Sequence, residues 1–180
     1  MIFYSMIKMI LQSIWNFYLR RTNPVKWARH LGVKVGEHTM ISPSVKFSSE
    51  PYLIKIGSNV QITSGVSIHT HGGGQVIRNI VEDFDCFGKV IIEDWVYIGS
   101  ESIIMPGVTI GTGSLIAAGS VVTKSVESGI VVGGNPAKRI STVQEYLEKN
   151  ISFNVHSKGM NEIEKKKYLL SLSDEKFIKK

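Results

Sequence analysis

Aliphatic residues recur at every sixth position in the middle third of the chain, and this spacing constrains the fold more than any other feature. The period matches neither the turn of an α-helix nor the simple alternation of a strand. A first run is followed, after an interruption, by a longer one: Ile56, Ile62 and Ile68, then Ile92, Ile98, Ile104, Ile110, Ile116 and Val122. A hexapeptide period is typical of parallel β-helices, so we expect a mainly β fold.

A second position follows the same period, four residues after the first. Small or β-branched side chains occupy it: Val60, Val66, Val96, Ser102, Val108, Ser114, Ser120 and Val126. Three hexapeptides make one coil of a triangular prism, so equivalent side chains are predicted to stack between coils as an internal ladder. Val35, Ile41 and Phe47 indicate a weaker earlier coil.

Composition limits the alternatives. A chain of 180 residues with 43% hydrophobic content fits one domain with a real core, which excludes global disorder. The single cysteine, Cys86, excludes an internal disulfide framework and a multi-thiolate metal site, and it favours a cytoplasmic location. The net charge of +6 indicates an anionic partner, which charge alone leaves open between nucleic acid, anionic lipid and a phosphorylated cofactor.

Residues 1–32 are predicted to form an amphipathic helical cap that is interrupted at Asn23-Pro24. On a helix the polar side chains fall along one stripe: Ser5, Lys8, Gln12, Asn16 and Arg20. The opposite face is apolar: Phe3, Ile7, Ile10, Ile14 and Phe17. Because positive charges follow the apolar run, a signal peptide or a membrane span is not favoured. The apolar face is expected to pack on the protein or a sister subunit, with peripheral contact to the inner membrane face as the alternative.

The repeat ends after Val122, where the spacing slips and Gly133-Gly134-Asn135-Pro136 follows. The chain is therefore divided into the helical cap, a β-helix over residues 33–140 and a C-terminal helical extension over residues 141–180. Helical patterns in that extension cover residues 142–150 and 161–172.

Residues 72–89 leave the period and then return to it in phase, because Ile92 lies four hexapeptides after Ile68. A loop is therefore expected to leave the prism and rejoin it at the next coil. Its start reads His69-Thr70-His71-Gly72-Gly73-Gly74. A histidine can act as a general base near neutral pH, and glycines allow close approach of the backbone to a substrate. A break in a regular repeat is where a functional site is expected.

Several segments in combination resemble the hexapeptide-repeat acyltransferases, in particular the sugar and capsular-polysaccharide O-acetyltransferases related to the maltose, galactoside and streptogramin acetyltransferases. The resemblance covers about residues 35–140. It rests on Thr70-His71-Gly72-Gly73, Phe87-Gly88-Lys89-Val90-Ile91-Ile92, Tyr97-Ile98-Gly99-Ser100, Ile104-Met105-Pro106-Gly107-Val108-Thr109-Ile110-Gly111, Val121-Val122-Thr123-Lys124 and Gly133-Gly134-Asn135-Pro136-Ala137-Lys138.

The resemblance implies a left-handed parallel β-helix and a homotrimer that holds acetyl-CoA in the grooves between neighbouring prisms. His71 matches the catalytic histidine of the family, which takes a proton from the acceptor hydroxyl with no metal required. In many relatives an aspartate follows this histidine, whereas Gly72 follows it here. Candidates to orient His71 therefore come from the loop: Glu82, Asp83 and Asp85.

The resemblance also assigns cofactor-binding positions. Those beside the pantetheine arm match Ser100, Ala118 and Thr123, and those beside the phosphates match Lys124 and Lys138, with Arg139 adjoining. Tyr97 stands where relatives place an aromatic residue that walls the groove. For the acceptor, the candidates are His69, Arg78, Asp83 and Asp85.

The predicted function is transfer of acetyl to a hydroxyl of a sugar or polysaccharide precursor. N-acetylation of an amino sugar or nucleotide-linked amino sugar is the enzymatic alternative, and a non-catalytic β-helix scaffold is an alternative of another class. A metal-dependent carbonic anhydrase on the same prism is disfavoured because its three histidine ligands are not matched: His30, His38 and His156 lie outside the regular repeat. Nucleic-acid binding is also disfavoured, since basic and aromatic residues form no recognised module.

Overall fold

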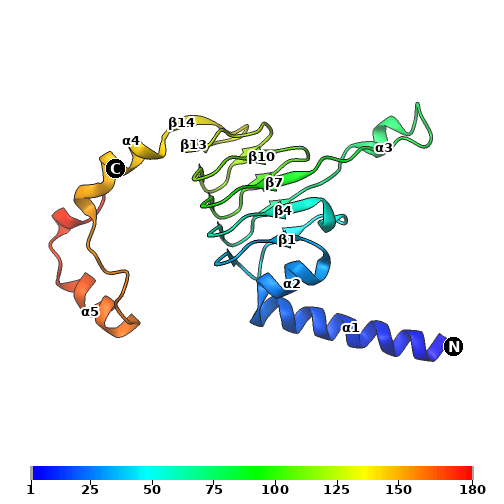
Figure 1. Cartoon of the computed structure of the whole chain (residues 1–180), viewed down its shortest axis with the longest axis horizontal. Helices are drawn as coiled ribbons and strands as arrows, with labels where there is room; N and C mark the ends of the chain where they lie inside the picture. Colours follow the sequence, from blue (N-terminus) through cyan, green and yellow to red (C-terminus); the bar gives the residue numbers. More distant parts are fainter. Residues whose placement is uncertain (1, 180) are drawn as a thin grey trace.

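The computed structural model describes residues 2–179, and its centre is a stack of coils built from short parallel strands (Figure 1). The strands form three sheets, which we call the first, second and third faces. The first face contains β1 (Lys34–Val35), β4 (Ile54–Ile56), β7 (Val90–Ile92) and β10 (Thr109–Ile110). The second face contains β2 (Met40–Ile41), β5 (Gln61–Ile62), β8 (Tyr97–Ile98), β11 (Leu115–Ile116), β13 (Ile130–Gly133) and β14 (Lys138–Thr142). The third face contains β3 (Lys46–Phe47), β6 (Ser67–Ile68), β9 (Ile103–Ile104) and β12 (Val121–Val122).

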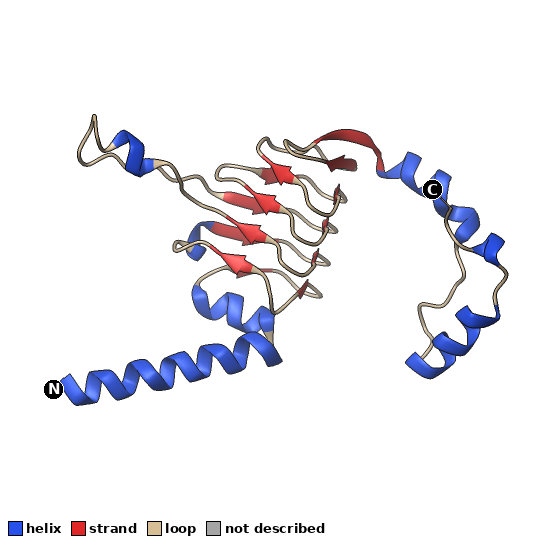
Figure 2. Ribbon diagram, turned by 180° about the vertical axis from the view of Figure 1, so that it is seen from behind, coloured by secondary structure: helices blue, strands red, loops and turns tan. Residues whose placement is uncertain are grey.

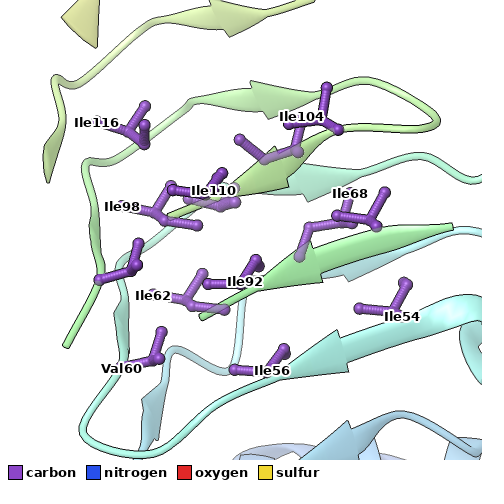
Figure 3. Close-up of a cluster of buried hydrophobic side chains, with 14 of the residues drawn as sticks. Ile54, Ile56, Val60, Ile62, Ile68, Ile92, Ile98, Ile104, Ile110 and Ile116 are labelled. Carbon is purple, nitrogen blue, oxygen red and sulfur yellow. The ribbon is translucent and has the colours of Figure 1, made fainter. Parts of the chain in front are cut away.

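The predicted ladder of aliphatic side chains fills the inside of the coils (Figure 3). Every isoleucine that recurs at the six-residue spacing, in both runs, is at most 2% exposed. Strand pairing keeps the ladder in register: on the third face Ile68 lies between Phe47 and Ile104, and Ile104 pairs in turn with Val122. Each isoleucine thus buries its side chain against its equivalents in the neighbouring coils, which is the main apolar burial of the fold.

The second periodic position is also buried, including where it is polar. Ser102 donates a hydrogen bond to the carbonyl oxygen of Ala117 at 3.0 Å, and Ser114 donates to that of Glu127 at 2.7 Å. Small hydroxyl side chains therefore satisfy turn carbonyls of the next coil inside the prism, which removes the cost of burying them.

The corners between the first and second faces need left-handed backbone in every coil. The five equivalent residues all have positive φ: His38, Asn59, Trp95, Gly113 and Gly129. Only glycine adopts this region without steric cost. The repeat therefore constrains the backbone at this corner more than it constrains the residue type.

Two insertions make the coils unequal. Between the first and second coils, equivalent residues lie 21 positions apart because η1 (Pro51–Leu53) is inserted before β4. Between the second and third coils they lie 36 apart, because the loop over residues 72–89 leaves the stack after β6. This loop carries the short helix α3 (Gly74–Ile77) and projects well away from the coils (Figure 1).

Two helices precede the coils, α1 (Ile2–Thr22) and α2 (Pro24–Leu31). The predicted break at Asn23-Pro24 is confirmed: the side chain of Asn23 caps α2 by accepting a hydrogen bond from the backbone N–H of Lys26 at 2.9 Å. Trp27 and Ala28 of α2 are buried. None of the helices within residues 2–179 combines the length and apolar character that crossing a membrane requires.

The C-terminal segment begins with an antiparallel pair, β13 and β14, which the repeat did not predict. The two predicted helices follow it as α4 (Val143–Asn150) and α5 (Glu162–Ser171), with η2 (Ile151–Phe153) between them and η3 (Asp174–Lys176) near the end. Both helices begin with a capping box, formed by Thr142 with Glu145 and by Asn161 with Glu164. Figure 2 shows this segment extending away from the end of the stack.

The coil geometry requires glycine at two positions for different reasons: Gly113 because of its backbone conformation, and Gly99 because of the close approach of the next coil. Gly113 has φ +68° with open space around a Cβ, whereas a Cβ on Gly99 would lie 2.5 Å from the backbone nitrogen of Ala118 in the next coil. We expect Gly113→Ala to destabilise the fold by about 1 kcal/mol through backbone strain alone. Gly99→Ala should cost about 2 to 3 kcal/mol, because neighbouring coils must separate. Chemical denaturation of both variants checks this, and equal losses would contradict the stacking account.

Candidate functional site

The loop over residues 72–89 leaves and rejoins the stack through a narrow neck. The backbone N–H of Gly88 donates to the carbonyl oxygen of Thr70 at 2.8 Å, and His71 forms an antiparallel bridge with Phe87. The rings of His71 and Phe87 also lie 5.6 Å apart between centroids. His71 is therefore fixed at the mouth of the loop, where the regular coil ends.

Strand register places Glu50 one coil below His71. Phe47 pairs with Ile68 in the neighbouring coil. Glu50 follows Phe47 by three residues, and His71 follows Ile68 by the same number. Oε2 of Glu50 lies 2.7 Å from Nδ1 of His71, and Thr70 donates to the same oxygen at 3.1 Å. Oγ of Ser48 lies 3.3 Å from the same ring nitrogen. The stacking of coils thus supplies the carboxylate that orients the histidine.

This pairing defines how the histidine presents its ring. An ionised carboxylate only accepts hydrogen bonds, so Nδ1 of His71 carries the proton and Nε2 is left as the basic nitrogen of the neutral ring. Desolvation raises the pKa of Glu50, but hydrogen bonds from Ser49, Thr70 and His71 outweigh it and hold that pKa below its ordinary value. Glu50 therefore stays ionised at neutral pH. Its side chain is 18% exposed and that of His71 is 39% exposed, so the histidine ring is open to solvent.

A hollow of about 310 Å³ opens beside His71. Its walls come from the neck, from both ends of the loop and from Glu50 in the coil below: Glu50, His71, Gly72, Gly73, Gly74, Gln75, Arg78, Asp85 and Phe87. Arg78 forms an ion pair with Asp85 at 3.5 Å and donates from Nε to the carbonyl oxygen of Phe84 at 3.0 Å. The glycines leave backbone groups bare along one wall, so the hollow offers a base, a charged pair and peptide groups to a polar ligand.

A second hollow of about 300 Å³ lies between the last coil and β14. Apolar and polar residues line it: Val122, Lys124, Ser125, Val126, Glu127, Ile130, Val132, Ala137 and Arg139. Two of the lining side chains are basic and one is acidic, and the basic ones suit an anionic group such as a phosphate. Of the predicted phosphate-binding residues, the structure brings Lys124 and Arg139 to this hollow. Lys138 is exposed on β14 and is not among its lining residues.

The other predicted cofactor positions occupy two different edges of the prism. Ser100 and Ala118 follow strands of the second face and are stacked one above the other, because Ile98 pairs with Ile116. Thr123 and Lys124 follow β12 of the third face, on the same edge as His71. Within one chain, the third face therefore separates the two sets. Tyr97 lies on the second face with its side chain exposed.

The acceptor candidates also divide. Arg78 and Asp85 line the hollow with His71, whereas His69 and Asp83 are exposed and are not among its lining residues. The expectation that a loop carboxylate orients His71 is wrong, because that contact belongs to Glu50. The coil spacing contained the signal: Glu50 and His71 are separated by the same 21 residues as Phe47 and Ile68.

No group of three or more His, Cys, Asp or Glu side chains within residues 2–179 is arranged to hold a metal ion. His69 and His71 are neighbours in sequence, but His71 is paired with Glu50 through Nδ1.

Comparison with known proteins yields consistent similarities. Residues 89–124 match the family described as the hexapeptide repeat of succinyl-transferase. Protein CapG of Staphylococcus aureus is 45% identical over 146 residues, which cover 79% of this chain and 85% of that protein. A hexapeptide-repeat acetyltransferase of Vibrio cholerae, solved with acetyl coenzyme A, is 25% identical with a TM-score of 0.60, over 73% of this chain and 85% of that one.

The polySia specific acetyltransferase NeuO is also similar, with 29% identity and a TM-score of 0.52 over 61% of this chain and 51% of that one. With these neighbours, the predicted left-handed parallel β-helix with helices at both ends is confirmed as the fold class.

Proposed function

Because the chain belongs to the hexapeptide-repeat acetyltransferase family, we propose that it transfers an acetyl group from acetyl-CoA to a hydroxyl of a sugar or polysaccharide precursor, with His71 as the general base. The observation that carries the proposal is the contact of 2.7 Å between Glu50 and His71 at the mouth of an open hollow. A relative that acts on polySia, a sugar polymer by its name, supports a carbohydrate acceptor.

In this mechanism Nε2 of His71 removes the proton from the acceptor hydroxyl as its oxygen attacks the thioester carbonyl. The bond from that oxygen to the acetyl carbon forms, the carbon–sulfur bond breaks, and the proton on His71 is returned to the departing thiolate. Glu50 stabilises the imidazolium that forms in between, because its carboxylate stays on Nδ1 throughout. No covalent enzyme intermediate is needed, so Cys86, which is exposed on the loop, has no part in the step.

The acceptor is proposed to enter the hollow beside His71. Arg78 and Asp85 would then contact its hydroxyl groups, since both line that hollow and already pair with each other at 3.5 Å. Paired charged groups and bare peptide groups suit a ligand that carries many hydroxyls. His69 and Asp83 remain acceptor candidates only if the loop rearranges when substrate binds.

The two separated edges support a trimer as the active form. A site that uses Ser100 and Ala118 together with His71 and Lys124 is incomplete within one chain, because the third face lies between them. We propose that the edge with Ser100 and Ala118 comes from a second copy. The loop also carries exposed apolar side chains suited to contact with a neighbouring copy: Val76, Ile77, Ile80 and Val81.

Acetyl-CoA is proposed to lie along this shared groove with its phosphates near the basic residues. Lys124 and Arg139 line one hollow, and Lys138 adjoins them on β14. Small side chains at Ser100, Ala118 and Thr123 leave room for an extended pantetheine arm, whose amides pair with exposed backbone groups. Tyr97 would wall the groove from the second face.

The decisive test of catalysis compares His71→Asn and Glu50→Gln in acetyl transfer to a panel of sugars and amino sugars. Loss of the base should lower kcat by about a hundredfold to ten-thousandfold while the affinity for coenzyme A is retained. Glu50→Gln should lower kcat by less, because the base remains but its orientation and charge stabilisation are lost. Full activity of His71→Asn would show that His71 is not the base. A preference of the wild-type protein for amine acceptors would show that an amine, and not a hydroxyl, is acetylated.

The cofactor assignment is tested by Lys124→Ala, with Lys149→Ala on α4 as the matched control for loss of one exposed charge. Removing a charge-assisted contact to a phosphate should raise the Michaelis constant for acetyl-CoA by about tenfold or more. The control should leave that constant unchanged. Steady-state kinetics measures both, and equal values for the two variants would undo the assignment of Lys124.

A further inference from the structure

From Gln12 to Arg20, helix α1 turns its polar stripe toward the fold. Nε2 of Gln12 lies 3.4 Å from Nε2 of His30, Oδ1 of Asn16 is buried, and Nε of Arg20 donates to the carbonyl oxygen of Pro43 at 2.6 Å. The three helix residues are spaced four apart, so they share one side of α1. A helix on a globular protein ordinarily packs its apolar stripe on the core, so the orientation of α1 is the reverse of the usual one.

The apolar side of α1 is exposed as a consequence. Large apolar side chains along it are all at least 42% exposed: Met6, Ile7, Ile10, Leu11, Ile14, Trp15, Phe17 and Tyr18. In both Figure 1 and Figure 2 the N-terminal half of α1 runs out past the coils and lies beside no other element. The sequence pattern also assigns Phe3, Ser5 and Lys8 to the two sides, but the structure describes only the backbone of these three residues. A contiguous exposed apolar surface of this kind marks a binding surface.

All of the net positive charge belongs to the segment that contains α1. Residues 1–36 contain no Asp or Glu, and residues 37–180 contain fifteen basic and fifteen acidic residues. Six basic residues therefore account for the net charge of +6: Lys8, Arg20, Arg21, Lys26, Arg29 and Lys34. This end of the molecule is strongly electropositive, although Arg29 is partly neutralised by Glu37 at 3.1 Å.

The apolar face and the charge meet at the last turns of α1. The guanidinium of Arg21 lies 4.7 Å from the ring centroid of Phe17, so a positive group sits directly on the apolar surface. A hollow of about 540 Å³ adjoins them and is lined by Phe17, Arg20, Arg21, Pro43 and Ser44. An aromatic ring beside two guanidinium groups is suited to a phosphate that is attached to an apolar chain.

We propose that α1 binds the surface of an anionic lipid bilayer, lying in the plane of the interface with its apolar face among the acyl chains. Charge complementarity selects this occupant. A symmetric contact between two copies of α1 would bring two electropositive segments together, whereas an anionic bilayer neutralises them. The basic residues and the apolar face then contribute to the same binding event.

The test is co-sedimentation of the full-length protein with vesicles of phosphatidylcholine, with and without phosphatidylglycerol. We expect binding to the anionic vesicles, weakening as salt is added, and little binding to phosphatidylcholine alone. Ile14→Glu should lower the apparent affinity by about tenfold or more, because it removes an apolar side chain that would be buried among the acyl chains and adds a negative charge. Ser13→Glu is the matched control: it adds the same charge on the neighbouring exposed residue without removing an apolar side chain, and should weaken binding less.

A second pair of variants separates charge from apolar contact. Replacing Arg21 and Lys26 with Gln should weaken binding to anionic vesicles by about fivefold for each charge. The same replacement at Lys165 and Lys166 on α5 should have no effect. Unchanged secondary structure by circular dichroism shows that each variant is folded.

Three outcomes would overturn the proposal. The first is a wild-type protein that remains in the supernatant with both kinds of vesicle. The second is an equal loss of vesicle affinity for Ile14→Glu and Ser13→Glu. The third is an equal loss of vesicle affinity for the double variant at Arg21 and Lys26 and the double variant at Lys165 and Lys166. If vesicles are not bound and Ile14→Glu lowers the molar mass measured by light scattering, the apolar face belongs instead to a contact between copies of the chain.

Discussion

The stacking of aliphatic side chains between coils is the interaction on which the rest of the structure depends. It fixes the register of every strand, and register decides which turn residues meet at the edges of the prism. Because Phe47 is held beneath Ile68, Glu50 lies beneath His71, so the contact on which the proposed chemistry depends follows from the packing of the apolar core. The neck formed by Thr70, His71, Phe87 and Gly88 then lets a long loop depart without disturbing the ladder.

Much of this could be predicted from the sequence, because a six-residue period has few structural solutions. The ladder, the departing loop and the position of His71 follow from this spacing, and the helices at both ends follow from their own helical patterns. Proximity in sequence to His71 does not predict Glu50, because the two residues are one coil apart and η1 lengthens that coil to 21 residues. The β13 and β14 pair was missed because it is antiparallel and lies where the period has already ended.

Other features depend on geometry that a periodic pattern does not contain. The motifs place Ser100, Ala118, Thr123 and Lys124 in one binding region, but the fold distributes them over two edges. The amphipathic pattern of α1 is evident from the sequence, yet the pattern does not say which side faces the fold. That side is the polar one, held by the contacts of Gln12 with His30 and of Arg20 with the carbonyl oxygen of Pro43. In both cases the missing information is how a surface is oriented, which depends on tertiary contacts.

We propose that His71, held by Glu50 at the interruption of the repeat, is the base in acetyl transfer and that a second copy of the chain completes its site. The sharpest test is a crystal structure with bound coenzyme A. We expect the coenzyme A sulfur to lie beside Nε2 of His71, Glu50 to remain on Nδ1, and Ser100 and Ala118 of another copy to line the pantetheine arm. A sulfur bound away from His71, or a complete site within one chain, would contradict this proposal.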